Sequence, residues 1–217
     1  MDMSTQTTFI PGLSDPRLTR FYDPVMKWVF WEEFIRRPLV DAVQAAPGHT
    51  IIDVGCGTGT LTIALAQAVP AATVIGLDID EAMLVQAHAK AKVAEAGRGP
   101  ALVQGSAVAL PWATGSIDTV VASMMVHHLP TAQKEALFAE AWRVLSPNGS
   151  FFLLDFNAPA TEWQATIARA VARFEQIDDN LYGPLPVMLR TTGFGRVDVI
   201  WQAFNGLLTL YRARKAN

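Results

Sequence analysis

Apolar residues along this chain fall into short runs that alternate with longer segments of helical spacing. The short runs are rich in β-branched residues and are predicted to form strands. These runs are 50–54, 73–77, 101–104, 117–122 and 150–155. Strands that alternate with helices indicate βαβ units and a mostly parallel sheet. The pattern therefore predicts an α/β fold.

The helical segments carry their own start and stop signals. Asp80 is a candidate N-cap before an Ala-rich run that ends at Gly97. Apolar residues recur at helical spacing between Thr131 and Leu145, and the sequence SPNG at 146–149 predicts a stop and a turn. We therefore expect two amphipathic helices, the second of which leads into a buried strand.

The last part of the chain has the period-two pattern of strands. Apolar residues alternate over 197–203 and again over 208–210, on either side of Asn205-Gly206. An Asn-Gly pair between two alternating runs is a strong signal for a tight turn. The sequence thus predicts a C-terminal antiparallel β-hairpin.

The length and the tail suggest one domain. The chain has 217 residues, of which 51% are hydrophobic and 17% charged, enough for one sizeable core. Residues 1–19 are rich in Thr, Ser and Pro without periodicity, and we expect a flexible tail there. Residues 20–46 read as one or two helices at the start of a single domain that spans 20–217.

Composition excludes several classes of protein. The net charge of −3 and the scattered Lys and Arg residues give no basic patch, so nucleic acid is not an expected partner. Cys56 is the only cysteine, which rules out an internal disulfide and any multi-cysteine metal site. The polar start lacks a secretory signal, and no apolar stretch approaches the ~20 residues that cross a bilayer. We therefore expect a cytoplasmic protein.

The sharpest feature is the sequence IIDVGCGTG at 51–59, an apolar strand that runs into a glycine-rich turn and then a helix. Glycines allow the backbone to turn tightly and a ligand to lie against the main chain, and the helix N-terminus offers free N–H groups. Asp78 ends the next strand, where a carboxylate can accept hydrogen bonds from both hydroxyls of a ribose. The pattern predicts a nucleoside-containing ligand.

Nicotinamide and flavin enzymes also use a glycine-rich strand-to-helix turn. Their fingerprint requires glycine at the sixth position, which here is Thr60. Asp53, two residues before the first glycine, would repel a pyrophosphate but would attract an ammonium group. These two residues disfavour a nicotinamide oxidoreductase.

Five stretches in the right order resemble the class I S-adenosylmethionine (SAM)-dependent methyltransferases, in the branch that includes ubiquinone/menaquinone C-methyltransferases. They are IIDVGCGTG (51–59), VIGLDID (74–80), VQGSAVALPW (103–112), IDTVVASMMVHHL (117–129) and RVLSPNGSFFLLD (143–155). The resemblance covers roughly residues 20–214. It implies a doubly wound, seven-stranded, mostly parallel sheet that ends in the antiparallel hairpin, with SAM as cofactor and no metal.

The same resemblance assigns roles to particular residues. Gly55, Gly57 and Gly59 would pass under the methionine part of SAM, Asp53 would reach its amino group, and Asp78 would hold the ribose. Many relatives have Asp where this chain has Ser106, although Ser can still form a hydrogen bond to adenine. For Cys56 in the loop, structural packing is the favoured role. The complete set of expected cofactor-binding residues is Asp53, Gly55, Cys56, Gly57, Gly59, Asp78, Ile79, Gly105, Ser106, Ala107 and Ser123.

Three residues near the carboxyl ends of the later strands are catalytic candidates. His127 and His128 follow the fourth strand, and either is a candidate general base or substrate contact. Capping the next helix or filling the pocket wall is an equally weighted alternative. Asp155 ends the fifth strand and could face a cationic substrate, take a proton or cap a loop.

The segment from Phe21 to Phe34 is unusually aromatic. By resemblance we interpret it as a lid over the SAM site, with Tyr22 touching SAM or the substrate. Plain core packing has about equal weight. Contact with a membrane surface is third, because the charges between Arg20 and Val40 nearly cancel, unlike those of a basic interfacial helix.

The predicted reaction is an in-line methyl transfer to a small, partly apolar acceptor such as a quinone precursor or an aromatic or amine metabolite. A phospholipid headgroup at a membrane surface is the alternative acceptor. A nicotinamide oxidoreductase and a SAM-binding protein without turnover are the competing classes. The sequence does not determine the oligomeric state.

Overall fold

The computed structural model describes residues 32–94, 99–157, 159, 161–171 and 185–215. The predicted tail at 1–19, Tyr22 and the first part of the aromatic segment lie outside these residues. The described end of the aromatic segment is the start of helix α2 (Glu32–Ala42), which contains Pro38.

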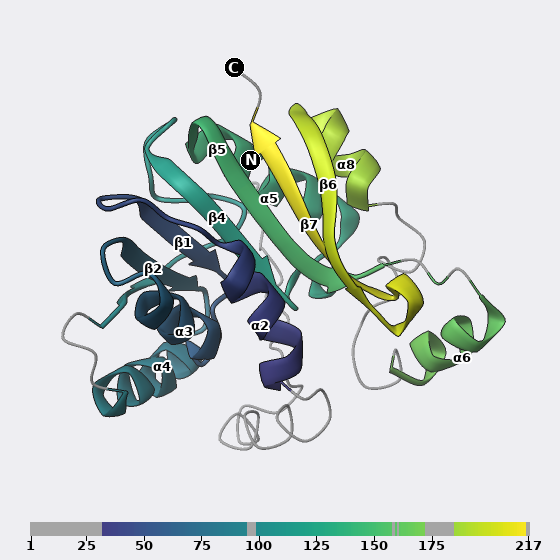
Figure 1. Cartoon of the computed structure of the whole chain (residues 1–217), viewed down its shortest axis with the longest axis horizontal. Coiled ribbons are helices and arrows are strands. Elements are labelled where there is room, and N and C mark those ends of the chain that lie inside the picture. The colour runs from purple at the N-terminus through teal and green to yellow at the C-terminus, as the bar shows by residue number, and fades with distance from the viewer. Residues whose placement is uncertain (1–31, 95–98, 158, 160, 172–184, 216–217) are drawn as a thin grey trace, which may run out of the picture.

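A seven-stranded sheet forms the centre of the molecule, with strand order β3-β2-β1-β4-β5-β7-β6 (Figure 1). Strands β1 to β5 pair in parallel, whereas β7 is antiparallel to both β5 and β6. The strands are β1 (Thr50–Val54), β2 (Thr73–Asp78), β3 (Ala101–Gln104), β4 (Ile117–Ser123), β5 (Leu145–Phe156), β6 (Phe194–Ala203) and β7 (Leu208–Lys215). This topology confirms the predicted doubly wound sheet with its terminal hairpin.

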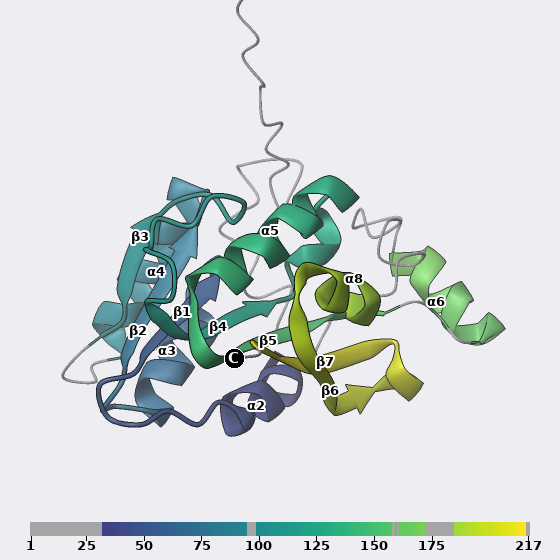
Figure 2. The ribbon, with the colours of Figure 1, turned by 90° about the horizontal axis from the view of Figure 1, so that it is seen from above.

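Helices cover both faces of the sheet, as Figures 1 and 2 show from two directions. Besides α2, the helices are α3 (Thr60–Ala68), α4 (Glu81–Val93), α5 (Thr131–Val144), α6 (Glu162–Val171) and α8 (Leu185–Thr192), with 3₁₀ turns η2 (Val126–His128) and η3 (Phe204–Gly206). Helices α2 and α3 lie over one face of the sheet, and α5 and α8 lie over the other. The sequence patterns had given no expectation for α6 or α8.

Each face of the sheet has its own hydrophobic core. Under α2 and α3, Leu39 and Leu65 pack on Ile51 and Val121. The other core lies under α5 and α8 and includes Phe138. Side chains alternate between the two cores along the central strands because successive residues of a strand point to opposite faces. The near-continuous apolar runs of the sequence follow from a sheet that is covered on both sides.

Strands β1 to β4 agree with the predicted ranges to within one residue. Strands β6 and β7 extend beyond the alternating runs, to Phe194 and Lys215, and β5 and α4 also differ from the predictions. Strand β5 begins at Leu145 rather than at 150, and its pairing with β4 shifts register across 146–149, where Asn148 has a φ of 65°. The predicted turn is therefore an irregularity at the start of the strand. Helix α4 begins after Asp80, whose side chain accepts the Ala82 N–H as predicted, but it ends at Val93 instead of Gly97.

The hairpin turn is made by residues with left-handed backbone conformations. Phe204, Asn205 and Gly206 have φ values of 51°, 54° and 91°. The buried Gln164 of α6 donates hydrogen bonds to the carbonyl oxygens of both Phe204 and Asn205. Helix α6 is thereby attached to the turn, at the side of the molecule away from α3 and α4 (Figure 1).

The chain order of the strands reverses between β1 and β4, because β2 and β3 lie on one side of β1 and β4 and β5 on the other. In open α/β sheets, ligands bind at the carboxyl ends of the strands at such a switch point. The topology therefore directs attention to the loops that follow β1, β2, β4 and β5.

Candidate cofactor and acceptor site

The loop after β1 turns through three glycines with positive φ. The values are 71° at Gly55, 54° at Gly57 and 75° at Gly59. A Cβ on Gly55 would lie 2.9 Å from the Met125 side chain, and one on Gly59 would lie 2.8 Å from Ala87. A Cβ on Gly57 would meet nothing within 4 Å. Two glycines are thus required by close packing, and the third faces open space.

Asp78, at the end of β2, is attached to this loop. Its carboxylate accepts the Gly57 N–H at 2.7 Å and the Asp80 N–H at 2.9 Å. Burial raises its pKa, although these N–H donors oppose the rise. The Ile79 backbone is a third donor to this carboxylate. A carboxylate has about four acceptor sites, so Asp78 can accept a further hydrogen bond. The residue predicted to hold a ribose also fixes the glycine loop.

Asp53 is buried beneath the same loop, with 2% of its surface exposed. One of its oxygens accepts the Thr62 hydroxyl at 2.6 Å. Burial raises the pKa of Asp53 to about 6, the Thr62 hydrogen bond and the charge of Arg36 oppose this rise, and Asp78 adds to it. A carboxylate with this environment favours a cation as its neighbour.

A pocket lies against the glycine loop and brings together residues from α2, β1, its loop, α3 and β4. Its lining residues are Arg36, Asp53, Gly55, Cys56, Gly57, Thr58, Leu61, Ser123 and Met124. Within the described residues, the buried Ser123 hydroxyl has no hydrogen-bond partner. The pocket therefore combines one carboxylate, one guanidinium and two hydroxyls, those of Thr58 and Ser123, around a glycine-rich backbone.

Cys56 has the surroundings of a packing residue. Burial raises the pKa of its thiol, and the nearby Asp53 and Asp78 carboxylates raise it further. Its sulfur also packs against β2, since a Cβ on Gly76 would lie 2.9 Å from it. A neutral, buried thiol is a poor nucleophile.

The predicted adenine contacts lie along the loops after β2 and β3. Ile79 is a large apolar residue, yet 42% of its surface is exposed. Gly105 donates its N–H to the Asp78 carbonyl oxygen and packs against Leu77, while Ala107 packs at the edge of the core. The Ser106 hydroxyl accepts the Val108 N–H at 3.4 Å. These residues form a strip that continues from Asp78.

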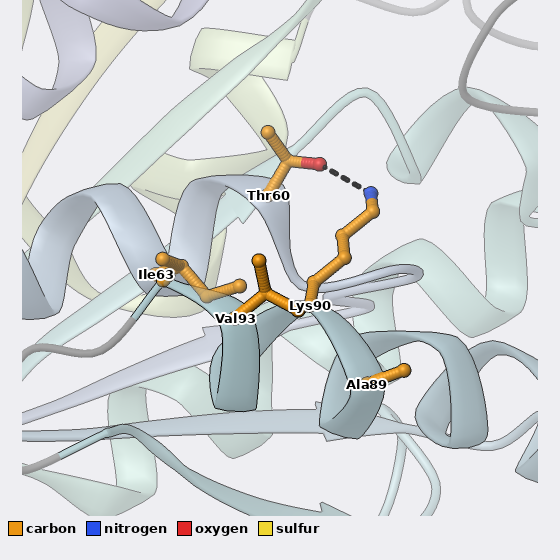
Figure 3. A pocket seen from close by; sticks show the side chains of 6 residues that line it. Thr60, Ile63, Ala89, Lys90 and Val93 are labelled. Atoms are coloured by element: carbon orange, nitrogen blue, oxygen red, sulfur yellow. Dashed lines mark hydrogen bonds between the residues drawn. The ribbon is translucent and has the colours of Figure 1, made fainter.

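A second groove, of about 490 Å³, lies between α3 and α4 (Figure 3). Lys90 reaches across it and donates to the hydroxyls of Thr58 and Thr60 at 2.7 and 2.9 Å. The rest of the lining is Ile63, Ala89, Val93 and Ala94. This groove contains none of the predicted site residues, and Lys90 in it ties α4 to the glycine loop.

The candidates after β4 and β5 form a buried pair. The His127 Nδ1 lies 2.8 Å from an Asp155 oxygen, and the two side chains are 1% and 0% exposed. His128 lies beside His127 with ring centroids 4.0 Å apart. The structure therefore unites three residues that the sequence had only placed near the same sheet edge.

Sequence analysis missed four pocket residues, Arg36, Thr58, Leu61 and Met124. Arg36 had been noted only as one of the charges in the aromatic segment, and its helical position gave no sign that it would lie near Asp53. Thr58 belongs to the glycine motif itself, so its place in the loop was a usable signal. Met124 follows Ser123 at the end of β4 and occupies a left-handed conformation with a φ of 54°.

In the part of the chain that the structure describes, no group of three or more His, Cys, Asp or Glu side chains could hold a metal ion. None of the helices in that part has the length and apolar character needed to cross a membrane.

Comparison with known proteins finds a family that this arrangement resembles. Residues 51–149 match the model of the family described as a methyltransferase domain. A demethylmenaquinone methyltransferase from Lactobacillus johnsonii is 34% identical over 125 residues, 57% of this chain and 50% of that protein. A ubiquinone/menaquinone biosynthesis C-methyltransferase from Cereibacter sphaeroides is 31% identical over 128 residues, 58% of this chain and 50% of that protein.

The similarity to these relatives is partial, because the chain spans about half of their length. Solved structures agree in fold. An S-adenosylmethionine-dependent methyltransferase in its apo form, SibL, has a TM-score of 0.75 at 18% identity, covering 96% of this chain and 60% of that one. An O-methyltransferase family protein from Burkholderia thailandensis has a TM-score of 0.72 at 16% identity, covering 94% and 61%.

Proposed function

We propose that the chain is a class I SAM-dependent methyltransferase and that it transfers the SAM methyl group to a reduced, quinone-type acceptor. The observation that carries the proposal is that Arg36 and Asp53 line the same pocket, beside the loop that contains Gly57. The methionine part of SAM is a zwitterion. A guanidinium and a carboxylate on a glycine-rich backbone match its two charges.

We assign the ends of that zwitterion by charge. Asp53 faces the ammonium group, directly or through a water, and Arg36 the carboxylate. An ammonium beside Asp53 compensates the burial that raises the pKa of this carboxyl. The buried Ser123 hydroxyl lines the same pocket and supplies a further hydrogen bond to the cofactor.

The rest of SAM follows the strip from the loop to β3. The open space above Gly57 admits the ligand close to the main chain. Asp78 accepts the ribose hydroxyls with the lone pairs that the loop N–H groups leave. Ile79, Gly105, Ser106 and Ala107 form the adenine side, with Ile79 against the face of the base.

The acceptor assignment follows from chemistry and from the relatives named above. The sulfonium of SAM supplies an electrophilic methyl group, so the acceptor must be a nucleophile. A quinone ring is itself an electrophile, whereas its two-electron reduced, dihydroxy form is electron-rich. We therefore propose the dihydroxy form as acceptor, with the protein aligning it for in-line displacement and excluding water.

Calorimetry and a turnover assay test the proposal in sequence. SAM and S-adenosylhomocysteine should bind, and NADH should not. Turnover should then release S-adenosylhomocysteine with chemically reduced, short-chain demethylmenaquinone as acceptor. Binding of NADH in place of SAM would overturn the cofactor assignment. SAM binding without turnover on this acceptor would overturn the acceptor assignment alone.

Three expectations from the sequence remain predictions. They are contact of Tyr22 with SAM or the acceptor, a cytoplasmic location, and the lack of a nucleic-acid partner. The sequence alone supports them.

A further inference from the structure

The Asp155 carboxylate is surrounded by N–H donors. One oxygen accepts the Phe156 N–H at 2.7 Å and lies 2.8 Å from His127 Nδ1. The other accepts the N–H groups of Val126 and His127 at 2.8 and 3.4 Å. Burial alone raises the pKa of Asp155, but it is outweighed by these backbone donors, by the hydrogen bond of His127 and by the positive charge that His127 has when it is protonated at acid pH, so the pKa lies below its ordinary value. The carboxyl group is therefore ionised at neutral pH.

An ionised carboxylate only accepts hydrogen bonds, which fixes the state of the histidine. Nδ1 of His127 must carry a proton in order to bond to Asp155. In the neutral imidazole the lone pair then lies on Nε2. Asp155 thus selects the tautomer in which Nε2 is the basic nitrogen, and it also stabilises the cation that forms when Nε2 takes a proton.

The pair lies next to the proposed cofactor pocket. Strand β4 ends at Ser123, which lines the pocket with Met124, and turn η2 with His127 follows after Met125. Among the described residues, the titratable side chains of Asp155 from β5 and of His128 from the same turn contact the His127 ring. The edge of the His127 ring also meets Phe156, so the surroundings of the base are partly apolar.

From this geometry we propose that His127 is the general base for an acceptor with an acidic aromatic hydroxyl, and that Asp155 is its positioning residue. The inference rests on the proposed methyl transfer and names the substrate class for it. A hydroxyl of this kind needs to lose its proton to become a strong nucleophile, whereas an acceptor that arrives already ionised needs no base.

The step balances as follows. The acceptor hydroxyl gives its proton to His127 Nε2, and the resulting phenolate attacks the methyl carbon through its ortho ring carbon. The bond from that methyl carbon to sulfur breaks, and its electron pair stays on sulfur in S-adenosylhomocysteine. The ring carbon then loses its hydrogen as a proton to water, the ring regains aromaticity, and His127 returns its proton to the oxygen.

The first test uses matched histidine variants of the full chain. H127N keeps an amide that can donate to Asp155 but lacks Nε2. Turnover should fall by about 10²- to 10⁴-fold, the usual contribution of a general base, with SAM affinity unchanged. H88N, which alters an exposed histidine of α4, is the control and should keep full turnover. Equal turnover of H127N and wild type would overturn the proposal.

The second test varies the acceptor. In a series of 1,4-dihydroxynaphthalenes whose ring substituents make the hydroxyl more acidic, the loss caused by H127N should shrink as the acceptor ionises by itself. The fall of wild-type kcat on acidification should also be absent in H127N. A loss that is equal for all acceptors and all pH values would mean that His127 only supports the structure. No methyl transfer by wild type to any member would overturn the acceptor class.

The tautomer is measurable without turnover. Nitrogen chemical shifts of ¹⁵N-histidine-labelled protein should show His127 protonated at Nδ1 and unprotonated at Nε2 at neutral pH. D155N, whose amide can donate to Nδ1, should invert this assignment and lower kcat with SAM affinity retained. Protonation of Nε2 alone in the wild type would overturn the proposal even if H127N failed to fold. Product analysis separates the two sites of methylation: an aryl ether would keep His127 as base and move the attack to oxygen.

Discussion

Asp53 and Asp155 have similar positions in the fold but pKa values that shift in opposite directions. Each is the second-last residue of a strand, and each is buried. Asp53 has a Thr62 hydroxyl as its hydrogen-bond donor, and burial raises its pKa to about 6. Asp155 has three backbone N–H donors and His127, and its pKa lies below the ordinary value.

The difference separates two uses of a buried carboxylate. The loop after β4 compensates the charge of Asp155 within the protein, so this residue stabilises the fold. The charge of Asp53 is only partly compensated by Thr62 and Arg36, so it costs stability until a cationic group arrives. Binding sites commonly have this character, since groups arranged for a ligand are strained without it.

The largest effect should come from truncating the compensated carboxylate. Asp155→Ala leaves three buried N–H groups and His127 without their acceptor and should lower the free energy of unfolding by about 3 to 5 kcal/mol at pH 7. Because the pKa of Asp155 is lowered in the fold, its stabilisation exists above the ordinary pKa and disappears as pH falls through the folded-state value. Urea unfolding at pH 7 and at acid pH measures both. A loss below about 1 kcal/mol would contradict the contrast with Asp53.

The next effect concerns the ligand side of the comparison. Asp78→Ala removes two charge-assisted hydrogen bonds to the ribose, each worth about 1.5 to 3 kcal/mol before water replaces them. We expect SAM to bind at least roughly 100-fold more weakly by calorimetry, or about 3 kcal/mol.

The matched control for Asp78 is its neighbour Asp80, whose side chain caps α4. Asp80→Ala should cost about 1 kcal/mol of stability as a lost helix cap and leave SAM affinity unchanged. Equal SAM affinity in the two variants would remove Asp78 from the site.

Neutralising Asp53, the only partly compensated carboxylate, should stabilise the protein and harm its function. A rise in pKa from 3.8 to about 6 means that ionised Asp53 destabilises the fold above pH 4, fully so above pH 6. Asp53→Asn should therefore raise the free energy of unfolding by about 2 to 3 kcal/mol at pH 8 and by almost nothing at pH 4, without ligand. SAM affinity should fall at the same time. A variant that is less stable than wild type at pH 8 would reverse the interpretation of Asp53.

The smallest effect separates backbone strain from ligand contact in the glycine loop. Gly57 and Gly48 both have positive φ and open space at the Cβ position. Replacing either by Ala should cost about 1 kcal/mol of stability, because L-residues are disfavoured in this conformation. Only Gly57→Ala should weaken SAM binding, since its methyl group points into the ligand space. Parallel thermal unfolding and calorimetry would show this, and equal SAM affinity in both variants would mean that the loop is structural.

Local sequence determined the features that depend on backbone preference and periodicity. Apolar runs that alternate with helical segments predicted the parallel sheet. Asn205-Gly206 predicted the hairpin, because these residues tolerate left-handed conformations. The same reason applies to the glycine loop, where all three predicted glycines have positive φ. Asp80 capped its helix as predicted, since a cap needs only residues that are neighbours in sequence.

Contacts between distant parts of the chain were decided by the tertiary structure alone. Arg36 and Asp53 come together because α2 packs over β1, and Lys90 reaches Thr58 because α4 lies beside α3. No local pattern encodes either approach.

The two aspartates show the limit most clearly, for they end similar runs, Ile-Ile-Asp-Val and Leu-Leu-Asp-Phe. The sequence by itself determined that both carboxylates would lie near the ends of strands, at the edge of the sheet where ligands bind. Only the tertiary structure decided how many N–H donors surround each one. Turn η2, 28 residues away in sequence from Asp155, brings His127 and two backbone N–H groups to that carboxylate. The pKa of a buried carboxyl depends on such donors as much as on burial, and so the two pKa values shift in opposite directions.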